Sequence, residues 1–215
     1  MTFNRPLAVP EAGTEELRRM LAVARERSLG LVPDLTGGQL LGPRLSIVNP
    51  PLWEIGHLGW FQERWCLRTA ADGTLSPSFL PGPDTLYDSA AFAHDTGWDL
   101  PLPPLEATLD YLSAVLERVC ERLHERRSDS DLAYFAQLAA LHEEMHAEAF
   151  TYTRQTLGYP VPAPVASFPV AEPVGAWPGD AEIESGEFML GAKTQEGFVF
   201  DNEKWAHPVG IAPFR

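Results

Sequence analysis

The stretch from Ser130 to Leu157 constrains the fold of this chain more than any other, because it predicts one long amphipathic helix. Apolar and small side chains recur along it at the three- and four-residue spacing of an α-helix. This face carries Leu132, Phe135, Ala139, His142, His146, Ala149, Phe150 and Thr153. A helix this long with one apolar face needs other helices to cover it, so the pattern predicts a helical bundle with both histidines turned inward.

Three further amphipathic helices are predicted before it. The first begins at Thr14, a plausible N-cap, and ends near Pro33, with Arg25 among the charged residues expected on its solvent face. The second begins at Asn49-Pro50-Pro51, since proline is tolerated in the first helical turn. The third carries one apolar stripe, made of Leu105, Leu109, Leu112, Leu116, Val119 and Leu123. A long segment over 71–104, rich in Gly, Pro, Asp and Ser, separates the second helix from the third, which predicts a four-helix bundle with one long crossover.

A proline-rich stretch ends the helical part of the chain. Six prolines fall between Pro160 and Pro178, and no helix can pass through them. Alternating apolar residues over 183–191 and 208–214 then predict two short strands. We therefore expect a bundle over 1–158, a linker over 159–179 and, over 180–215, the incomplete start of a second domain, because so few residues cannot bury a core of their own.

Composition excludes several classes of protein. Sixteen Lys and Arg against thirty Asp and Glu give a net charge of -14, with no basic stripe, which argues against nucleic-acid binding. There is no apolar run of about 18 residues, so no membrane span is expected. Cys66 and Cys120 form no C-x-x-C pattern and are interpreted as packing thiols of a cytoplasmic protein.

The pair His142 and His146 can bind one metal ion, because residues four apart share a helix face. His142-Glu143-Glu144-Met145-His146 also matches H-E-x-x-H, the zinc-protease motif in which the glutamate is the general base. A protease needs a third ligand further along the chain, and the candidate, Glu172, lies in the proline-rich stretch.

The alternative third ligand is His57, in the middle of the aromatic face of the second helix. Three imidazoles suit Fe(II), Zn and Cu alike, so the residue types alone do not identify the metal. In a purely structural interpretation, His57, His142 and His146 only satisfy hydrogen bonds in the core. His94 and Asp95, in the crossover, are interpreted as part of a surface turn.

Several segments together resemble a known family. Asn49–Glu63 is similar to its first metal-histidine segment, and His142–Glu148 to its paired-histidine segment. Ile183–Gly191 and Phe200–Val209 are similar to the opening of its second domain. The family comprises the iron-dependent synthases that join sulfur or selenium to the imidazole of trimethylhistidine (hercynine), in ergothioneine and selenoneine biosynthesis. They combine a DinB-like four-helix bundle with a domain related to formylglycine-generating enzyme.

The resemblance implies that His57, His142 and His146 bind non-haem Fe(II), and that the substrates are hercynine, O2 and a selenosugar or thiol. It places the catalytic residues in the later domain, so the 215 residues alone are expected to be inactive. Ergothioneine synthases commonly have glutamine where this chain has Met145, a candidate substrate contact. The presence of Met145 instead of glutamine favours selenoneine formation, as do the Asn49–Glu54 run and the His94–Asp99 patch. The alternatives are an ergothioneine sulfoxide synthase and a DinB-like metal- or thiol-binding module without redox activity.

Overall fold

The computed structural model describes residues 13–70, 72–162, 175, 178–193 and 198–215. The chain divides into two compact units. The first, within residues 12–167, is helical, and the second contains the two strands within residues 168–215. Each unit is described by itself.

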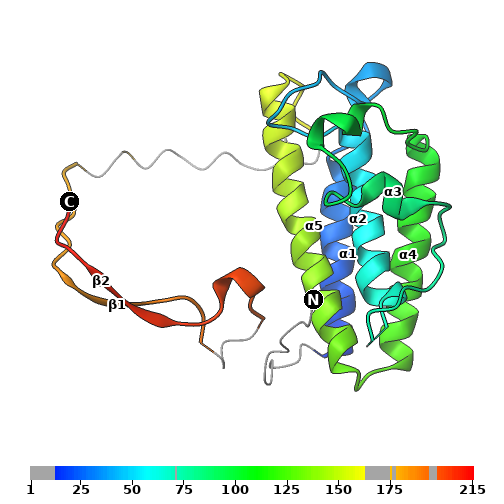
Figure 1. Ribbon diagram of the computed structural model, residues 1–215. Coiled ribbons are helices and arrows are strands. Elements are labelled where there is room, and N and C mark those ends of the chain that lie inside the picture. The colour runs from blue at the N-terminus through cyan, green and yellow to red at the C-terminus, as the bar shows by residue number, and fades with distance from the viewer. Residues whose placement is uncertain (1–12, 71, 163–174, 176–177, 194–197) are drawn as a thin grey trace. The chain divides into compact units, whose positions relative to one another are not determined.

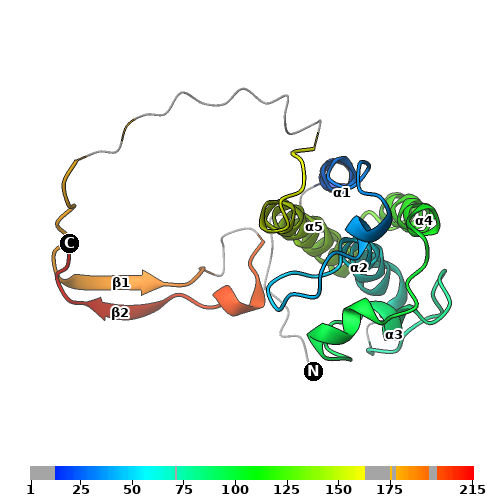
Figure 2. The same ribbon diagram turned by 90° about the horizontal axis from the view of Figure 1, so that it is seen from above.

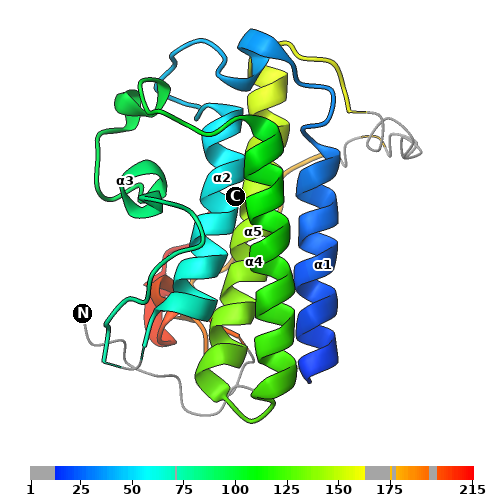
Figure 3. The same ribbon diagram turned by 90° about the vertical axis from the view of Figure 1, so that its right-hand side faces the viewer.

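The helical unit is a four-helix bundle, as predicted. Its helices are α1 (Thr14–Gly30), α2 (Pro51–Glu63), α4 (Leu105–Glu125) and α5 (Ser130–Thr156). They lie side by side, with α1 against α5 and α2 against both α4 and α5 (Figures 1 and 2). The colour gradient in Figure 3 shows that α2 and α4 run in the same direction. A parallel pair cannot be joined by a tight turn, which explains the long crossover between them.

The helix ends follow local chemistry. Pro51 is the first residue of α2, and the Asp129 carboxylate caps α5 by accepting a 3.0 Å hydrogen bond from the Leu132 amide. The predicted cap of α1 is wrong by one residue. The Leu17 amide donates to the Gly13 carbonyl, so Gly13 is the N-cap and Thr14 already lies in the first turn.

The crossover is held against α2 over much of its length. It contains the short helix α3 (Pro83–Tyr87) and a 3₁₀ turn (His94–Trp98), and α3 packs on α2. Tyr87 is fully buried against Trp53 and Trp60. A side chain at Gly56 would meet this ring, because a Cβ there would lie 2.4 Å from the Tyr87 ring. The glycine therefore allows α3 to approach α2 closely.

Buried Glu63, the last residue of α2, fixes the start of the crossover. Its carboxylate accepts hydrogen bonds from Ser78 Oγ at 2.6 Å, the Phe79 amide at 2.7 Å and the Tyr111 hydroxyl at 2.6 Å. Burial, reinforced by the Glu63 charge, raises the pKa of Tyr111 well above its usual range, so Tyr111 remains a donor. Beyond Glu63 the helix continues as a π-helical turn, Arg64–Arg68.

The interior contains an ion pair that the sequence pattern did not predict. Arg25, expected on the solvent face of α1, is 4% exposed, and that expectation is wrong. Its guanidinium donates to Glu143 at 2.8 and 3.2 Å, to the Gln62 side chain at 2.9 Å and to the Leu112 carbonyl at 2.6 Å. Burial is tolerated because the charge is paired and its donors find acceptors on the three other bundle helices.

Both cysteines are free thiols in the helical unit. Cys66 is buried and Cys120 is half-buried. Burial raises the pKa of the Cys66 thiol to about 12, so it is a packing group rather than a nucleophile. None of the helices in the described residues is long and apolar enough to cross a membrane.

The second unit contains the two predicted strands. β1 (Gly186–Leu190) pairs antiparallel with β2 (His207–Ile211), from Gly186 opposite Ile211 to Leu190 opposite His207. A further bridge joins Ile183 to Phe214. Every residue of β1 is exposed. Most of the predicted linker over 159–179 lies outside the described residues.

Candidate metal centre

His57 of α2 and His142 and His146 of α5 converge at one point of the bundle. One ring nitrogen from each lies within 4.8 Å of the others, so the three can hold a metal ion. The Nε2 atoms of His57 and His142 are 3.3 Å apart. Two ligand nitrogens, each about 2.1 Å from one ion and roughly 100° apart, would show about this separation. The spacing therefore fits two ligands of a single ion.

Hydrogen bonds orient two of the three rings. His57 Nδ1 lies 2.8 Å from the Tyr87 carbonyl oxygen, and His146 Nδ1 lies 2.8 Å from Glu54 Oε1. Both partners are acceptors, so each Nδ1 donates and the Nε2 lone pair of each neutral ring stays available. This is the outer shell of support that metal-binding histidines usually have.

Sequence reasoning missed both of these partners. Glu54 precedes His57 by three residues and therefore lies near it on α2. An acidic residue on a helix with so many aromatic residues could have indicated a partner for a metal-binding histidine. The Tyr87 carbonyl carries no side-chain signal. It reaches His57 only because α3 folds back onto α2.

Aromatic rings pack against the imidazoles. Phe61 stacks on His142 with ring centroids 3.7 Å apart and planes 9° apart, and Trp53 stacks on His57 at 4.9 Å and 16°. These contacts restrict rotation of the two rings. The aromatic face of α2 therefore also forms a wall of the histidine site.

The electrostatics favour neutral ligands next to a buried negative charge. Burial, with a smaller contribution from His146, lowers the pKa of His57 to about 3. Burial also lowers the pKa of His142, to about 2, with smaller contributions from the neighbouring His146 and His57. Glu54 is 1% exposed, and its Oε2 has no hydrogen-bond partner in the described part of the chain. A cation held by the histidines would balance this carboxylate, so the residues fit a metal.

The three histidines differ in their exposure to solvent. His57 is 5% exposed and forms the buried end, whereas His142 and His146 are half-buried. Three protein ligands, two of them partly exposed, leave coordination positions for further ligands, which is typical of catalytic rather than structural metal sites.

The other residues that the sequence suggested for a site are paired elsewhere, exposed or outside the described residues. Glu143 is 2% exposed and paired with Arg25, so it cannot serve as the general base that a zinc protease needs. Glu172, the third ligand of that interpretation, lies outside the described residues. Met145 is 50% exposed on α5. His94 and Asp95 are exposed in the 3₁₀ turn, which confirms the surface interpretation.

Comparison with known proteins identifies the family of the bundle. A model described as the DinB superfamily matches residues 20–150. Hercynine oxygenase from Mycolicibacterium smegmatis is 32% identical over 208 residues, which cover 94% of this chain and 46% of that protein. Hercynine oxygenases from Mycolicibacterium thermoresistibile and Mycobacterium tuberculosis are each 29% identical, over 97% and 94% of this chain and 46% and 47% of their own length. This chain thus spans about half the length of these relatives. It belongs to the DinB superfamily.

Proposed function

We propose that His57, His142 and His146 bind a non-haem Fe(II), and that the protein is an O2-dependent enzyme acting on hercynine. The observation that carries the proposal is the convergence of three imidazoles from α2 and α5, two of them partly exposed. The likeness to proteins named hercynine oxygenase over 94% of the chain supports the substrate.

The residues of this chain would bind the metal ion and orient the imidazole rings that hold it. Glu54 and the Tyr87 carbonyl hold the protons of His146 and His57 on Nδ1, so each Nε2 presents a lone pair. Phe61 and Trp53 hold the ring planes and exclude water from the buried side. Fe(II), when bound, supplies the redox chemistry that couples O2 reduction to formation of a carbon–chalcogen bond.

The proposed reaction balances with O2 as the oxidant. The C–H bond of the imidazole carbon between the two nitrogens breaks, as does the S–H or Se–H bond of the donor, and a carbon–sulfur or carbon–selenium bond forms. One oxygen atom leaves as water with the two hydrogens, and the other remains on the chalcogen. As donor we propose a selenosugar, with a thiol as the alternative.

Met145 is the residue through which the donor is proposed to be distinguished. Its thioether lacks the hydrogen-bonding groups of the glutamine that ergothioneine synthases commonly have there, and its 50% exposure leaves it accessible. The remaining substrate-contacting and catalytic groups are proposed to come from a domain related to formylglycine-generating enzyme. That domain begins near residue 180, after the bundle over 1–158 and the linker over 159–179.

Metal analysis tests the site itself. After anaerobic loading and desalting, the chain is expected to retain one Fe(II), and His146→Ala, His142→Ala and His57→Ala are each expected to lose it while circular dichroism shows an intact bundle. His94→Ala is the matched control, because His94 is exposed on the crossover. Unchanged iron content in His146→Ala would show that the ligand assignment is mistaken.

Turnover of the full-length protein tests the reaction. Hercynine and O2 are supplied with either a selenosugar or a cysteine-containing thiol, and consumption of all three substrates is followed. A preference for the selenosugar supports selenium transfer, and a preference for the thiol supports the alternative. If iron binds but neither donor is consumed, the bundle is a metal-binding module rather than part of this enzyme.

A further inference from the structure

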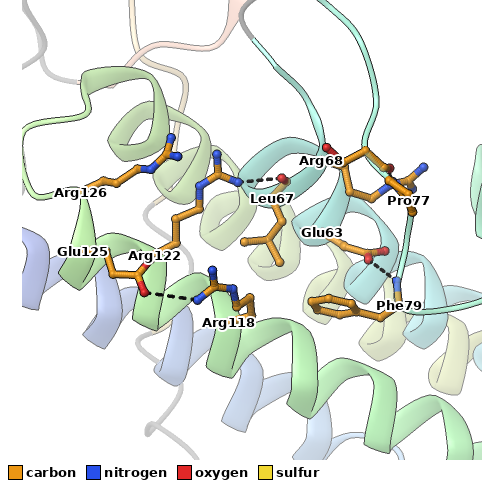
Figure 4. Close-up of a pocket in the computed structure, with 10 residues that line it drawn as sticks. Glu63, Leu67, Arg68, Pro77, Phe79, Arg118, Arg122, Glu125 and Arg126 are labelled. Atoms are coloured by element: carbon orange, nitrogen blue, oxygen red, sulfur yellow. Dashed lines mark hydrogen bonds and ion pairs between the residues drawn. The ribbon is translucent and has the colours of Figure 1, made fainter.

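A pocket lies on the helical unit, and it shares no lining residue with the histidine centre. It is a pocket of about 300 Å³ between α4, the π-helical turn Arg64–Arg68 and the 76–79 segment of the crossover (Figure 4). Arg118 and Arg122 of α4 line it together with Arg126, the residue after the helix, and Leu67 and Phe79 line it from the π-helical turn and the crossover. Nothing in the proposed reaction uses these groups.

The three arginines form a row of like charges. Arg118 and Arg122 lie one turn apart on one face of α4, and Arg126 is the residue that directly follows the helix. Like charges at this spacing destabilise a helix unless something compensates them. The row occurs in a chain whose net charge is -14, so it is not a consequence of overall composition.

Arg122, at the centre of the row, forms no ion pair with any of the described residues. Its guanidinium donates to the Leu67 carbonyl at 2.6 Å, and no acidic oxygen of the described residues lies within 4.0 Å of it. Burial lowers the pKa of Arg122 and the neighbouring Arg126 lowers it further, while the Asp129 carboxylate opposes these effects only in part. A partly buried cation beside other cations would be stabilised by an anion.

The acids near the pocket are committed elsewhere or lie at its edge. Glu63 already accepts three hydrogen bonds, from Ser78, Phe79 and Tyr111. Glu125 lies 3.5 Å from Arg118, which is also paired with Glu121 at 2.9 Å, and both acids are exposed. Asp129 approaches Arg126 only to 3.7 Å. The guanidinium of Arg122 is therefore the least compensated of the three arginines in the pocket.

We propose that this pocket binds a small oxyanion, a phosphate or a carboxylate, with Arg122 as the central ligand and Arg126 and Arg118 beside it. Planar guanidinium groups suit both anions, because each can donate two parallel hydrogen bonds. Leu67 and the half-exposed Phe79 provide an apolar wall for the body of an organic anion. The bound anion would link α4 to the π-helical turn and the crossover, and thereby stabilise the bundle.

Titration calorimetry on the whole chain tests this site, with inorganic phosphate and benzoate as separate probes at constant ionic strength in chloride. We expect saturable binding of one equivalent of at least one probe. Tighter binding of phosphate would identify a phosphate ligand, and tighter binding of benzoate a carboxylate with an apolar body. Arg122→Gln keeps a donor for the Leu67 carbonyl but removes the charge, so the affinity should fall about 10-fold or more.

Arg127→Gln is the matched control. Arg127 is exposed, hydrogen-bonds to His124 and does not line the pocket, so its loss should change the affinity less than about twofold by screened charge alone. If Arg122→Gln does not fold, exposed Arg126→Gln is judged by the same criterion. Absence of saturable binding for both probes would overturn the proposal, as would equal affinity in the pocket variant and the control.

Discussion

Glu54 and His146 are 92 residues apart in the chain and are joined by a 2.8 Å hydrogen bond between Oε1 and Nδ1. The bond links α2 to α5 at the histidine site, so it sets the orientation of one proposed ligand from the helix that carries another. With Glu54 Oε2 unpaired in the described residues, it places a buried negative charge directly behind the imidazole.

Glu54→Gln should weaken Fe(II) binding while leaving the bundle folded. The amide can still accept from His146 Nδ1 but carries no charge, and losses of outer-shell partners typically cost about 10- to 100-fold in metal affinity. Competition with a chromophoric chelator measures the affinity. Glu148→Gln, an exposed acid two residues after His146, is the control for a general loss of negative charge. Equal losses in both variants would show that the hydrogen bond is unimportant.

Glu143→Gln should lower stability rather than affect the chemistry at the metal. It leaves Arg25 buried without its counter-ion, and breaking a buried pair typically costs about 3–5 kcal/mol. Urea unfolding at pH 7 measures the loss, and Arg25→Met combined with Glu143→Leu should recover part of it. A zinc protease would behave differently, with activity lost and stability kept. An unchanged free energy of unfolding would contradict the structural role assigned here.

Asp84→Asn should destabilise the protein at neutral pH and much less in acid. Hydrogen bonds from Arg68, helped by one from Trp60, lower the pKa of Asp84 to about 2 from the usual 3.8. They outweigh burial, which by itself would raise this pKa. The folded-state pKa is depressed, so this contribution is fully present above pH 3.8 and is lost as the pH falls through 2. Unfolding free energies of both proteins, measured from pH 7 to 2, should converge at the acid end. A difference independent of pH would rule out ionisation as its source.

Gly56→Ala should disturb both the fold and the metal site. The added Cβ would lie 2.4 Å from the Tyr87 ring, and overpacking of this kind costs about 1–3 kcal/mol. Displacement of Tyr87 would also move the carbonyl that holds His57, so Fe(II) affinity should fall with stability. Gly38→Ala, where nothing lies within 4 Å of the new Cβ, should change stability by less than about 0.5 kcal/mol. Wild-type stability in Gly56→Ala would show that α3 can move away from the added methyl group without lowering the free energy of unfolding.

Sequence periodicity determined the elements of the bundle well. The predicted helices at Asn49-Pro50-Pro51, Leu105 and Ser130 begin where α2, α4 and α5 begin, because proline geometry and an Asp129 cap are local signals. The pair His142 and His146 was equally readable, because spacing along one helix depends only on helical geometry.

Tertiary structure alone decided how the polar groups pair. Arg25 and Glu143 are 118 residues apart, and each by itself reads as a solvent-exposed charge. Whether a charge is buried depends on what lies opposite it, which periodicity along one segment cannot show. For the same reason the sequence offered His57 as one possible third ligand. The packing of α2 on α5 brought it within 4.8 Å of the other two, while Glu54 and the Tyr87 carbonyl oriented the rings from elements that only the fold brings together.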